Sequence, residues 1–233
     1  MLLKIGLFTF HDNNRKCAVG IPALVSKLGG SPISIIFAEP GDKREDYDPS
    51  NLMLPPQEYA KALHIPYAVI KHNDAATIAA IKELHLDLGI VLGAKLLDKE
   101  VIEAFTIGII NVHPGKLPEY GGSSTIQWAI KETDPVYVTC HLIDPKLDTG
   151  EMLEEKQINV EVGDTYQTFV DRVLDNEIEM LVRNTNRIDK APDHINTTPI
   201  RDTKIWPKMD ALMARDTIAK FNEYKLYMLD EQR

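Results

Sequence analysis

The sequence has little cysteine, no long apolar run and no excess of positive charge, and each absence argues against a class of protein. Its only cysteines are Cys17 and Cys140, which lie far apart along the chain. Two isolated thiols do not make the dense disulfide framework of a small secreted domain, and they indicate a reducing compartment. The N-terminal stretch is apolar for only a few residues, so it lacks the core of a signal peptide.

Membranes and nucleic acids are the next partners that the composition argues against. No apolar run approaches the roughly 20 residues that a membrane helix needs. The formal net charge is −9, whereas proteins that bind nucleic acid usually carry basic surface to displace phosphate counterions. We therefore expect a soluble, cytoplasmic protein with neither a membrane nor a nucleic-acid partner.

The length and the apolar content are sufficient for a sizeable core. The chain has 233 residues, of which 44% are hydrophobic, and this predicts one main domain with at most a small appendage. We place the main domain at residues 1–188 and a C-terminal tail with a helix at residues 189–233. The sequence contains no internal repeat and no low-complexity tract.

The order of apolar runs and amphipathic stretches predicts the fold class. Between runs expected to form strands lie stretches expected to form helices, and this alternation predicts an α/β fold. We expect an open, mostly parallel Rossmann-like sheet with helices on both faces. The expected strands are 4–10, 33–38, 67–70, 88–92 and 107–112, and the expected helices are 18–28, 57–64, 74–84 and 98–105. Residues 39–56 lack any period and predict a long surface loop.

The second half of the chain has a different pattern. Two strands, 136–143 and 152–160, flank the segment 144–151 and are expected to continue the sheet. A long amphipathic helix is expected over 164–183, with Asp164 as its N-cap and Gln167 completing a capping box. A further amphipathic helix is expected from 210 to about 227.

The residues with the clearest chemical potential are Asn111 and His113, at the carboxyl end of an expected parallel strand, where ligands gather in open α/β sheets. They are two positions apart, so their side chains point to the same side, and Pro114 favours an extended His113. An amide N–H and a protonated imidazole can together stabilise an oxyanion, and imidazole exchanges protons near neutral pH. A single His before Pro is, however, more often a structural loop residue.

A carboxylate that could orient the imidazole is available in the loop Leu147–Gly150, at Asp148. Its Asp-Thr-Gly sequence also occurs in aspartic proteases, but those use two such carboxylates and an all-β fold. The linear sequence does not show that Asp148 approaches His113.

The stretches NVHPGKLPEYGG and VYVTCHLIDPKLDTGEML resemble the folate-dependent formyltransferases. That family includes glycinamide ribonucleotide transformylase, methionyl-tRNA formyltransferase and the sugar N-formyltransferases. Its pattern, Asn-x-His-Pro-x-x-x-Pro followed by an Asp-x-Gly loop, is met here by Asn111, His113, Pro114, Pro118, Asp148 and Gly150. The resemblance extends over about residues 88–158.

The resemblance implies an enzyme that uses N10-formyltetrahydrofolate as its formyl donor. Asn111 would bind the oxyanion, His113 would act as the acid or electrostatic partner, and Asp148 would orient His113 and help to relay protons. The folate pteridine would lie against backbone, with one segment on either side. The residues implied for folate are Lys95, Leu96, Leu97, Ile143, Asp144 and Leu147. Without the resemblance, nothing in the sequence distinguishes Lys95 from an ordinary surface lysine.

The acceptor is inferred mainly by elimination. Residues 10–14 lack the glycine-rich phosphate loop of glycinamide ribonucleotide transformylase, and Asp12 would repel a phosphate. A short, acidic chain disfavours methionyl-tRNA. These arguments leave the sugar N-formyltransferases, and hence the primary amine of a nucleotide-linked amino sugar. We expect Tyr120, His11 and Asn13 to contact this substrate; stacking on Tyr120 or Trp206 is possible in principle, although packing is the commoner role of such rings.

Several alternatives stay open at this point. The chain could be glycinamide ribonucleotide transformylase-like, or a formyltetrahydrofolate hydrolase, although that enzyme usually has a regulatory domain before its first strand. A non-catalytic folate-binding protein on the same fold would not be expected to keep the three catalytic residues. The other histidines lack metal-ligand spacing, so no metal is predicted. A homodimer is expected because helical tails in such enzymes often pair.

The chain also departs from the family pattern at two places. Gly115-Lys116-Leu117 stands where the family often has Ser-Leu-Leu, and Gly121-Gly122 stands where it often has a basic residue before glycine. Both departures are expected to alter the acceptor side more than the catalytic group.

Overall fold

The computed structural model describes residues 2–12, 15–40 and 54–232, and the chain divides into two compact units. The first unit comprises Met1–Asn111, Leu142–Pro145 and Leu181–Ile195; the second comprises Val112–His141, Lys146–Met180 and Asn196–Arg233. The expected surface loop over 39–56 lies mostly outside the described residues, and the expected domain boundary at residue 188 stays a prediction.

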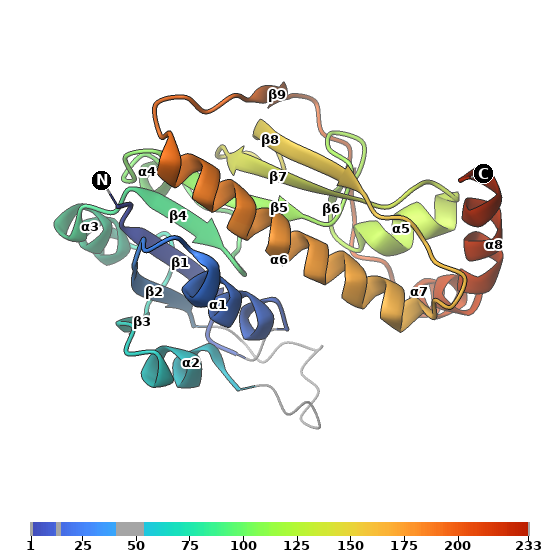
Figure 1. Ribbon diagram of the computed structural model, residues 1–233, viewed down its shortest axis with the longest axis horizontal. Coiled ribbons are helices and arrows are strands. Elements are labelled where there is room, and N and C mark those ends of the chain that lie inside the picture. Colours follow the sequence, from blue (N-terminus) through green and yellow to red (C-terminus); the bar gives the residue numbers. More distant parts are fainter. Residues whose placement is uncertain (1, 13–14, 41–53, 233) are drawn as a thin grey trace. The chain divides into compact units, whose positions relative to one another are not determined.

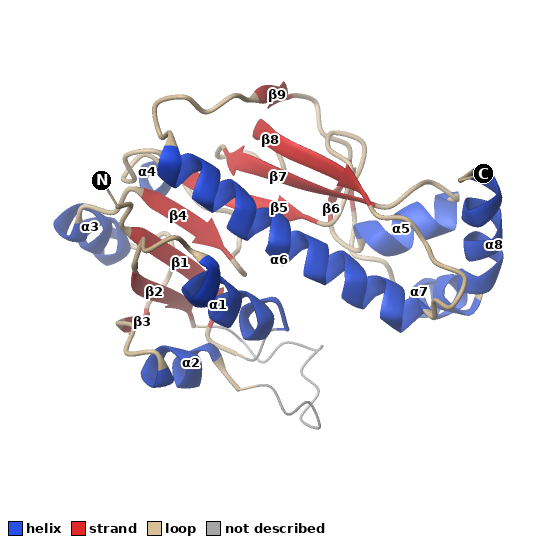
Figure 2. Ribbon diagram, in the orientation of Figure 1, coloured by secondary structure: helices blue, strands red, loops and turns tan. Residues whose placement is uncertain are grey.

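The first unit is built on parallel strands in the order β3-β2-β1-β4-β5, with β5 included as far as Asn111 (Figures 1 and 2). The strand order reverses between β1 and β4, and ligands bind beside such switch points in open α/β sheets. The strands are β1 (Ile5–Phe10), β2 (Ile33–Glu39), β3 (Tyr67–Val69), β4 (Leu88–Val91) and β5 (Gly108–His113). The helices are α1 (Arg15–Lys27), α2 (Pro56–Ala62), α3 (Ala75–Leu84) and α4 (Lys99–Ile102). Helix α4 is shorter than the predicted 98–105.

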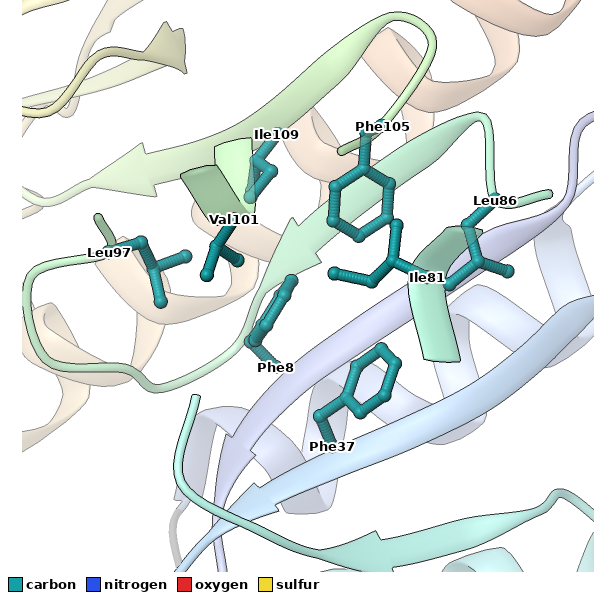
Figure 3. Packing of buried hydrophobic residues seen from close by; sticks show 8 residues of the cluster. All are labelled: Phe8, Phe37, Ile81, Leu86, Leu97, Val101, Phe105 and Ile109. Atoms are coloured by element: carbon teal, nitrogen blue, oxygen red, sulfur yellow. The ribbon is translucent and has the colours of Figure 1, made fainter. Parts of the chain in front are cut away.

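Alternate side chains of these strands point to opposite faces of the sheet, and both faces are buried. On one face Phe8 and Phe37 pack beside Ile81 of α3 and Val101 of α4, in the apolar cluster of Figure 3. On the other face, which α1 covers, Leu7 and its neighbours are fully buried (Figure 1). Continuous apolar strands are what a sheet covered on both sides requires.

The second unit contains β7 (Tyr137–Ile143) as far as His141, with β8 (Gly150–Gln157) and β9 (Thr198–Ile200), of which β8 and β9 are antiparallel. A separate two-stranded sheet pairs β6 (Gly121–Gly122) with β10 (Ile205–Trp206) in parallel. Helices α7 (Ala211–Ala219) and α8 (Phe221–Glu231) pack against α5 (Thr125–Glu132) (Figure 1). The single helix predicted from 210 is therefore two helices, with Lys220 between them.

The long amphipathic helix is α6 (Tyr166–Lys190), which ends later than predicted. Its predicted N-cap was wrong by one residue. The Thr165 hydroxyl accepts from the Thr168 N–H at 3.2 Å, and the Thr168 hydroxyl accepts from the Thr165 N–H at 3.0 Å. This is a reciprocal cap built from two threonines. Asp164 instead accepts from the Glu161 N–H at 2.7 Å and pairs with Arg172.

The predicted fold class is confirmed: a mostly parallel sheet is covered by helices, and further helices follow near the C-terminus. Among the described residues, none of the helices combines the length and the apolarity needed to cross a membrane.

Candidate active site

The end of β5 carries the two residues that the sequence singles out. Asn111 is half-buried and is the last residue of this stretch of the first unit, whereas His113 belongs to the second unit and is 6% exposed. The strand ends at His113 because Pro114 has no N–H to donate to a neighbouring strand. The chain is thus extended through His113, as predicted.

The structure brings His113 and Asp148 together within the second unit. The His113 Nδ1 atom lies 3.6 Å from Asp148 Oδ1, and the side chains are only 7% and 9% exposed. On the opposite side of the ring, Nε2 lies 2.8 Å from the carbonyl oxygen of Tyr120. A carbonyl oxygen only accepts, so Nε2 donates this hydrogen bond. A protonated ring would therefore have an acceptor at each nitrogen.

Asp148 has an unusual backbone conformation and is held by two hydrogen bonds. Its φ of 50° lies in the left-handed region, which Asp tolerates better than most residues. Its carboxylate Oδ2 accepts from the Gly122 N–H at 2.7 Å. Its carbonyl oxygen accepts from the Thr203 hydroxyl at 2.8 Å. The carboxylate consequently has one oxygen committed to backbone and the other facing His113.

The turn after β5 is fixed by buried threonine hydroxyls. Thr125 donates to the Pro114 carbonyl at 2.6 Å, and Thr139 donates to the Gly115 carbonyl at 2.7 Å. A Cβ on Gly115 would lie 2.3 Å from the Tyr120 carbonyl oxygen and 2.8 Å from His113 Nε2. Glycine at position 115 is therefore explained by the close approach of the very groups that hold the imidazole.

Tyr120 is held by a ring stack and by its hydroxyl. It is 7% exposed, and it stacks on Trp206 with 5.5 Å between ring centroids and 5° between ring planes. Its hydroxyl donates to the Asp134 carboxylate, and burial, with this hydrogen bond second, raises the pKa of the phenol. The ring thus packs within the protein, and its assignment to substrate stays a prediction.

The residues predicted for folate fall into two groups. In the first unit, Leu97 belongs to the apolar cluster of Figure 3, and Ile143 packs against the same cluster. The Leu96 side chain is 49% exposed, and the Leu96 carbonyl accepts from the Asn73 side chain at 3.0 Å. Asp144 follows Ile143 in the same unit. In the second unit, the Leu147 side chain is 46% exposed.

Beside Lys95 and Leu96 the first unit has a pocket of about 260 Å³, also lined by Glu39, Lys71, His72, Asn73 and Asp74. The His72 Nδ1 atom lies 3.7 Å from Glu39, and Nε2 donates to the Phe37 carbonyl at 3.1 Å. Burial lowers the pKa of His72.

The remaining predicted substrate residues lie near the end of β1. His11 Nδ1 is 3.0 Å from the Tyr67 hydroxyl, and burial raises the pKa of Tyr67 to about 12. Asn13 lies outside the described residues. His11 thus has a tyrosine partner, and its contact with substrate stays a prediction.

Three groups around the His113–Asp148 pair were missed from the sequence. They are the carbonyl of Tyr120, the N–H of Gly122 and the hydroxyl of Thr203. Two are backbone groups, which leave no mark in a sequence pattern. Thr203 lies in a polar stretch 55 positions from Asp148, so only the tertiary fold reveals the contact. Over the part of the chain that the structure describes, no cluster of three or more His, Cys, Asp or Glu residues could hold a metal ion.

Known protein sequences resemble a large part of this chain. Residues 37–185 match the Formyl transferase family, and they include both His113 and Asp148. A methionyl-tRNA formyltransferase from Prochlorococcus marinus is 30% identical over 171 residues, covering 71% of this chain and 52% of that protein. One from Alkaliphilus metalliredigens is 32% identical over 127 residues, covering 54% of this chain and 40% of that protein. The chain thus spans about half the length of these relatives, or less.

Solved structures share the fold at lower identity. Phosphoribosylglycinamide formyltransferase from Bacillus halodurans has a TM-score of 0.64 at 20% identity, covering 82% of this chain and 99% of that chain. An N-formyltransferase from Helicobacter canadensis, solved with folinic acid and dTDP-3-aminofucose, has a TM-score of 0.66 at 16% identity. It covers 96% of this chain and 82% of that chain.

Proposed function

The chain belongs to the formyl transferase family, and from this premise we propose that it transfers a formyl group from N10-formyltetrahydrofolate to the primary amine of a nucleotide-linked amino sugar. The observation that carries the proposal is the buried His113–Asp148 pair, 3.6 Å apart, at the end of β5. An imidazole beside a carboxylate, both shielded from water, suits a step in which negative charge develops on a carbonyl oxygen.

In the proposed reaction the acceptor nitrogen forms a bond to the formyl carbon, and the bond from that carbon to N10 then breaks. The formyl oxygen carries negative charge between these steps, and the Asn111 amide and the His113 imidazolium stabilise it. The amine loses one proton and the leaving N10 gains one, and Asp148 relays this proton. Because Nε2 of His113 donates to the Tyr120 carbonyl, the geometry supports an electrostatic role for His113 over direct proton donation.

The residues assigned to folate have a chemistry that fits a flat, partly apolar ring with polar edges. Leu96 and Leu147 are large apolar side chains that are about half exposed, and covering them would release ordered water. In the first unit, Leu97 and Ile143 add buried apolar surface of their own. Backbone groups of residues 95–97 would pair with the polar ring edge. The folate, when bound, supplies the activated formyl group.

The sugar acceptor is supported by two observations. The likeness to the Helicobacter canadensis enzyme, which was solved with dTDP-3-aminofucose, extends over 96% of this chain and so includes most of the C-terminal tail. The segment after β1 also lacks a glycine-rich phosphate loop and has Asp12, which would repel the phosphate of glycinamide ribonucleotide.

Methionyl-tRNA is a second candidate acceptor, because relatives of about 30% identity carry that activity in their names. The net charge of −9 argues against it, since binding to an RNA backbone draws most of its affinity from cationic surface. Transfer of the formyl group to water is a further alternative, and the same assay detects it.

The test is a formyl-transfer assay with N10-formyltetrahydrofolate and a panel of acceptors: dTDP-linked amino sugars, glycinamide ribonucleotide, methionyl-tRNA and no acceptor. We expect turnover with an amino sugar, and its loss in His113→Asn. His85→Asn is the matched control, because His85 has a φ of 52° at the exposed end of α3, where Asn is well tolerated. Activity with glycinamide ribonucleotide alone would overturn the choice of acceptor, and equal activity of the two variants would overturn the catalytic role.

A further inference from the structure

The C-terminal tail contacts the candidate active site through a short segment, residues 203–206, that the proposed chemistry does not use. Thr203 donates its hydroxyl to the Asp148 carbonyl at 2.8 Å. Lys204 follows and leads into β10, which pairs in parallel with Gly121–Gly122. The same few residues therefore reach both the Asp148 loop and the turn after β5.

The pairing of segment 203–206 with the turn is continuous. Lys204 donates its N–H to the Pro118 carbonyl at 2.8 Å and accepts from the Gly121 N–H at 3.0 Å. Trp206 accepts from the Ser123 N–H at 3.0 Å. These bonds fix the peptide of Gly122, whose N–H is the donor to the Asp148 carboxylate.

Side chains of the segment reinforce the same turn. The Trp206 ring stacks on Tyr120, and its Nε1–H donates to the Glu119 carbonyl at 3.1 Å. Tyr120 provides the carbonyl that accepts from His113 Nε2. Lys204 Nζ lies 3.7 Å from the centre of the Trp206 ring on a cation–π contact. Segment 203–206 thus contacts both residues that flank the His113 imidazole, Tyr120 and Asp148.

We infer that segment 203–206 positions the catalytic pair: Thr203 fixes the Asp148 backbone, and β10 with Trp206 fixes the Gly122 N–H and the Tyr120 carbonyl. Thr203 is a positioning residue, because it touches Asp148 and not the reacting atoms. Asp148 stands at a positive φ, a conformation that costs a non-glycine residue free energy and persists only when its surroundings hold it. This inference rests on the proposed function for its catalytic consequence.

Three variants test the role of the Thr203 hydroxyl. Thr203→Val removes the hydroxyl and keeps the branched shape that packs against Gly121, where a Cβ would come within 2.4 Å of Thr203 Cγ2. Thr203→Ser keeps the hydroxyl. Thr197→Val is the matched control, because Thr197 lies on the same tail and donates its hydroxyl to Glu151 at an exposed site, at 2.9 Å.

The readouts are steady-state kinetics with the amino sugar that the wild type uses, and hydrogen exchange of the amides of residues 146–152. In Thr203→Val we expect kcat to fall about tenfold and the amides to exchange faster, as the loss of one hydrogen bond predicts. KM should be unchanged, Thr203→Ser should restore kcat, and Thr197→Val should match the wild type.

The outcomes separate this inference from the proposed function. If the wild type transfers formyl groups but Thr203→Val behaves as Thr197→Val does, the positioning role is wrong and the function stands. Faster amide exchange with an unchanged kcat would leave Thr203 a structural residue and refute its role in catalysis. A wild type without formyl transfer to any acceptor would overturn both, whatever the exchange rates.

Discussion

Replacing Asp148 with asparagine removes one negative charge from the site and keeps an oxygen for the Gly122 N–H. The backbone should not resist the change, since asparagine tolerates the φ of 50° at this position at least as well as aspartate does. The new amide nitrogen would face His113 Nδ1 and donate to it. A donor at this position cannot pair with a hydrogen on Nδ1, so the variant would lose the partner that a protonated ring needs there.

The size of the effect follows from the distance between the two groups. When the His113 ring is protonated, it and the Asp148 carboxylate are two unit charges 3.6 Å apart, which attract by about 4.6 kcal/mol at an effective dielectric constant of about 20. An interaction of that size, felt fully in the transition state, corresponds to roughly 10³-fold in rate. Exposed fractions of 7% and 9% leave little water to screen the pair. We expect kcat of Asp148→Asn to fall by about 10²–10³-fold, as for other removed stabilisers of a developing charge.

The measurement is kcat for formyl transfer, with thermal unfolding measured in parallel. Asp202→Asn is the matched control, because Asp202 is an exposed aspartate at a φ of 53° on the tail and loses the same charge. A kcat for Asp148→Asn within threefold of the control would refute the electrostatic reasoning. So would a loss of activity matched by a loss of folded protein.

Three further predictions concern stability and pH. Gly115→Ala should lower the unfolding free energy by roughly 1–3 kcal/mol through overpacking against the Tyr120 carbonyl, which urea unfolding would measure; an unchanged urea midpoint would contradict the close approach. Tyr120→Phe should cost about 0.5–1.5 kcal/mol in the same assay, since it removes the hydroxyl donor to Asp134, an exposed carboxylate that water can still solvate. His72 has a pKa lowered from 6.5 by burial, so the unfolded chain binds this proton more tightly and stability should be lost as the pH falls below 6.5. His72→Gln should lose less stability than the wild type between about pH 7.5 and about pH 5.5, and equal losses would exclude His72 as a cause.

The strands of the first unit were predictable because they are apolar over most of their length. Runs such as Ile33–Glu39 and Gly108–His113 lie in a sheet with both faces buried. A strand buried on both faces needs apolar side chains at consecutive positions, and such a run can be recognised in the sequence. The place of Asn111 and His113 near the end of β5 followed from the same pattern. The Asp148 loop was assigned through the family motif, and its approach to His113 needed the fold.

Elements of the second unit were harder to predict for a physical reason. β6 consists of Gly121 and Gly122, which have no side chains to show a period, and its partner β10 has only two residues. Helix α5 has eight residues and begins after Ser124, which has a φ of 55° and makes no side-chain cap. Ser124 and Gln127 have the spacing of a capping box, but eight residues are too few for several turns of periodicity to reveal a helix in a sequence.

The stack of Trp206 on Tyr120 also fixes the optical properties of the molecule. The chain has two tryptophans, and they touch each other, with 4.7 Å between the ring centroids of Trp128 and Trp206. The tryptophan fluorescence of the whole protein therefore arises at one place, where the tail meets the turn after β5. Coupling between two indoles so close together gives a near-ultraviolet circular dichroism signal that disappears when they separate. The circular dichroism of an unlabelled sample thus reports, in real time, whether the tail is packed against the turn after β5.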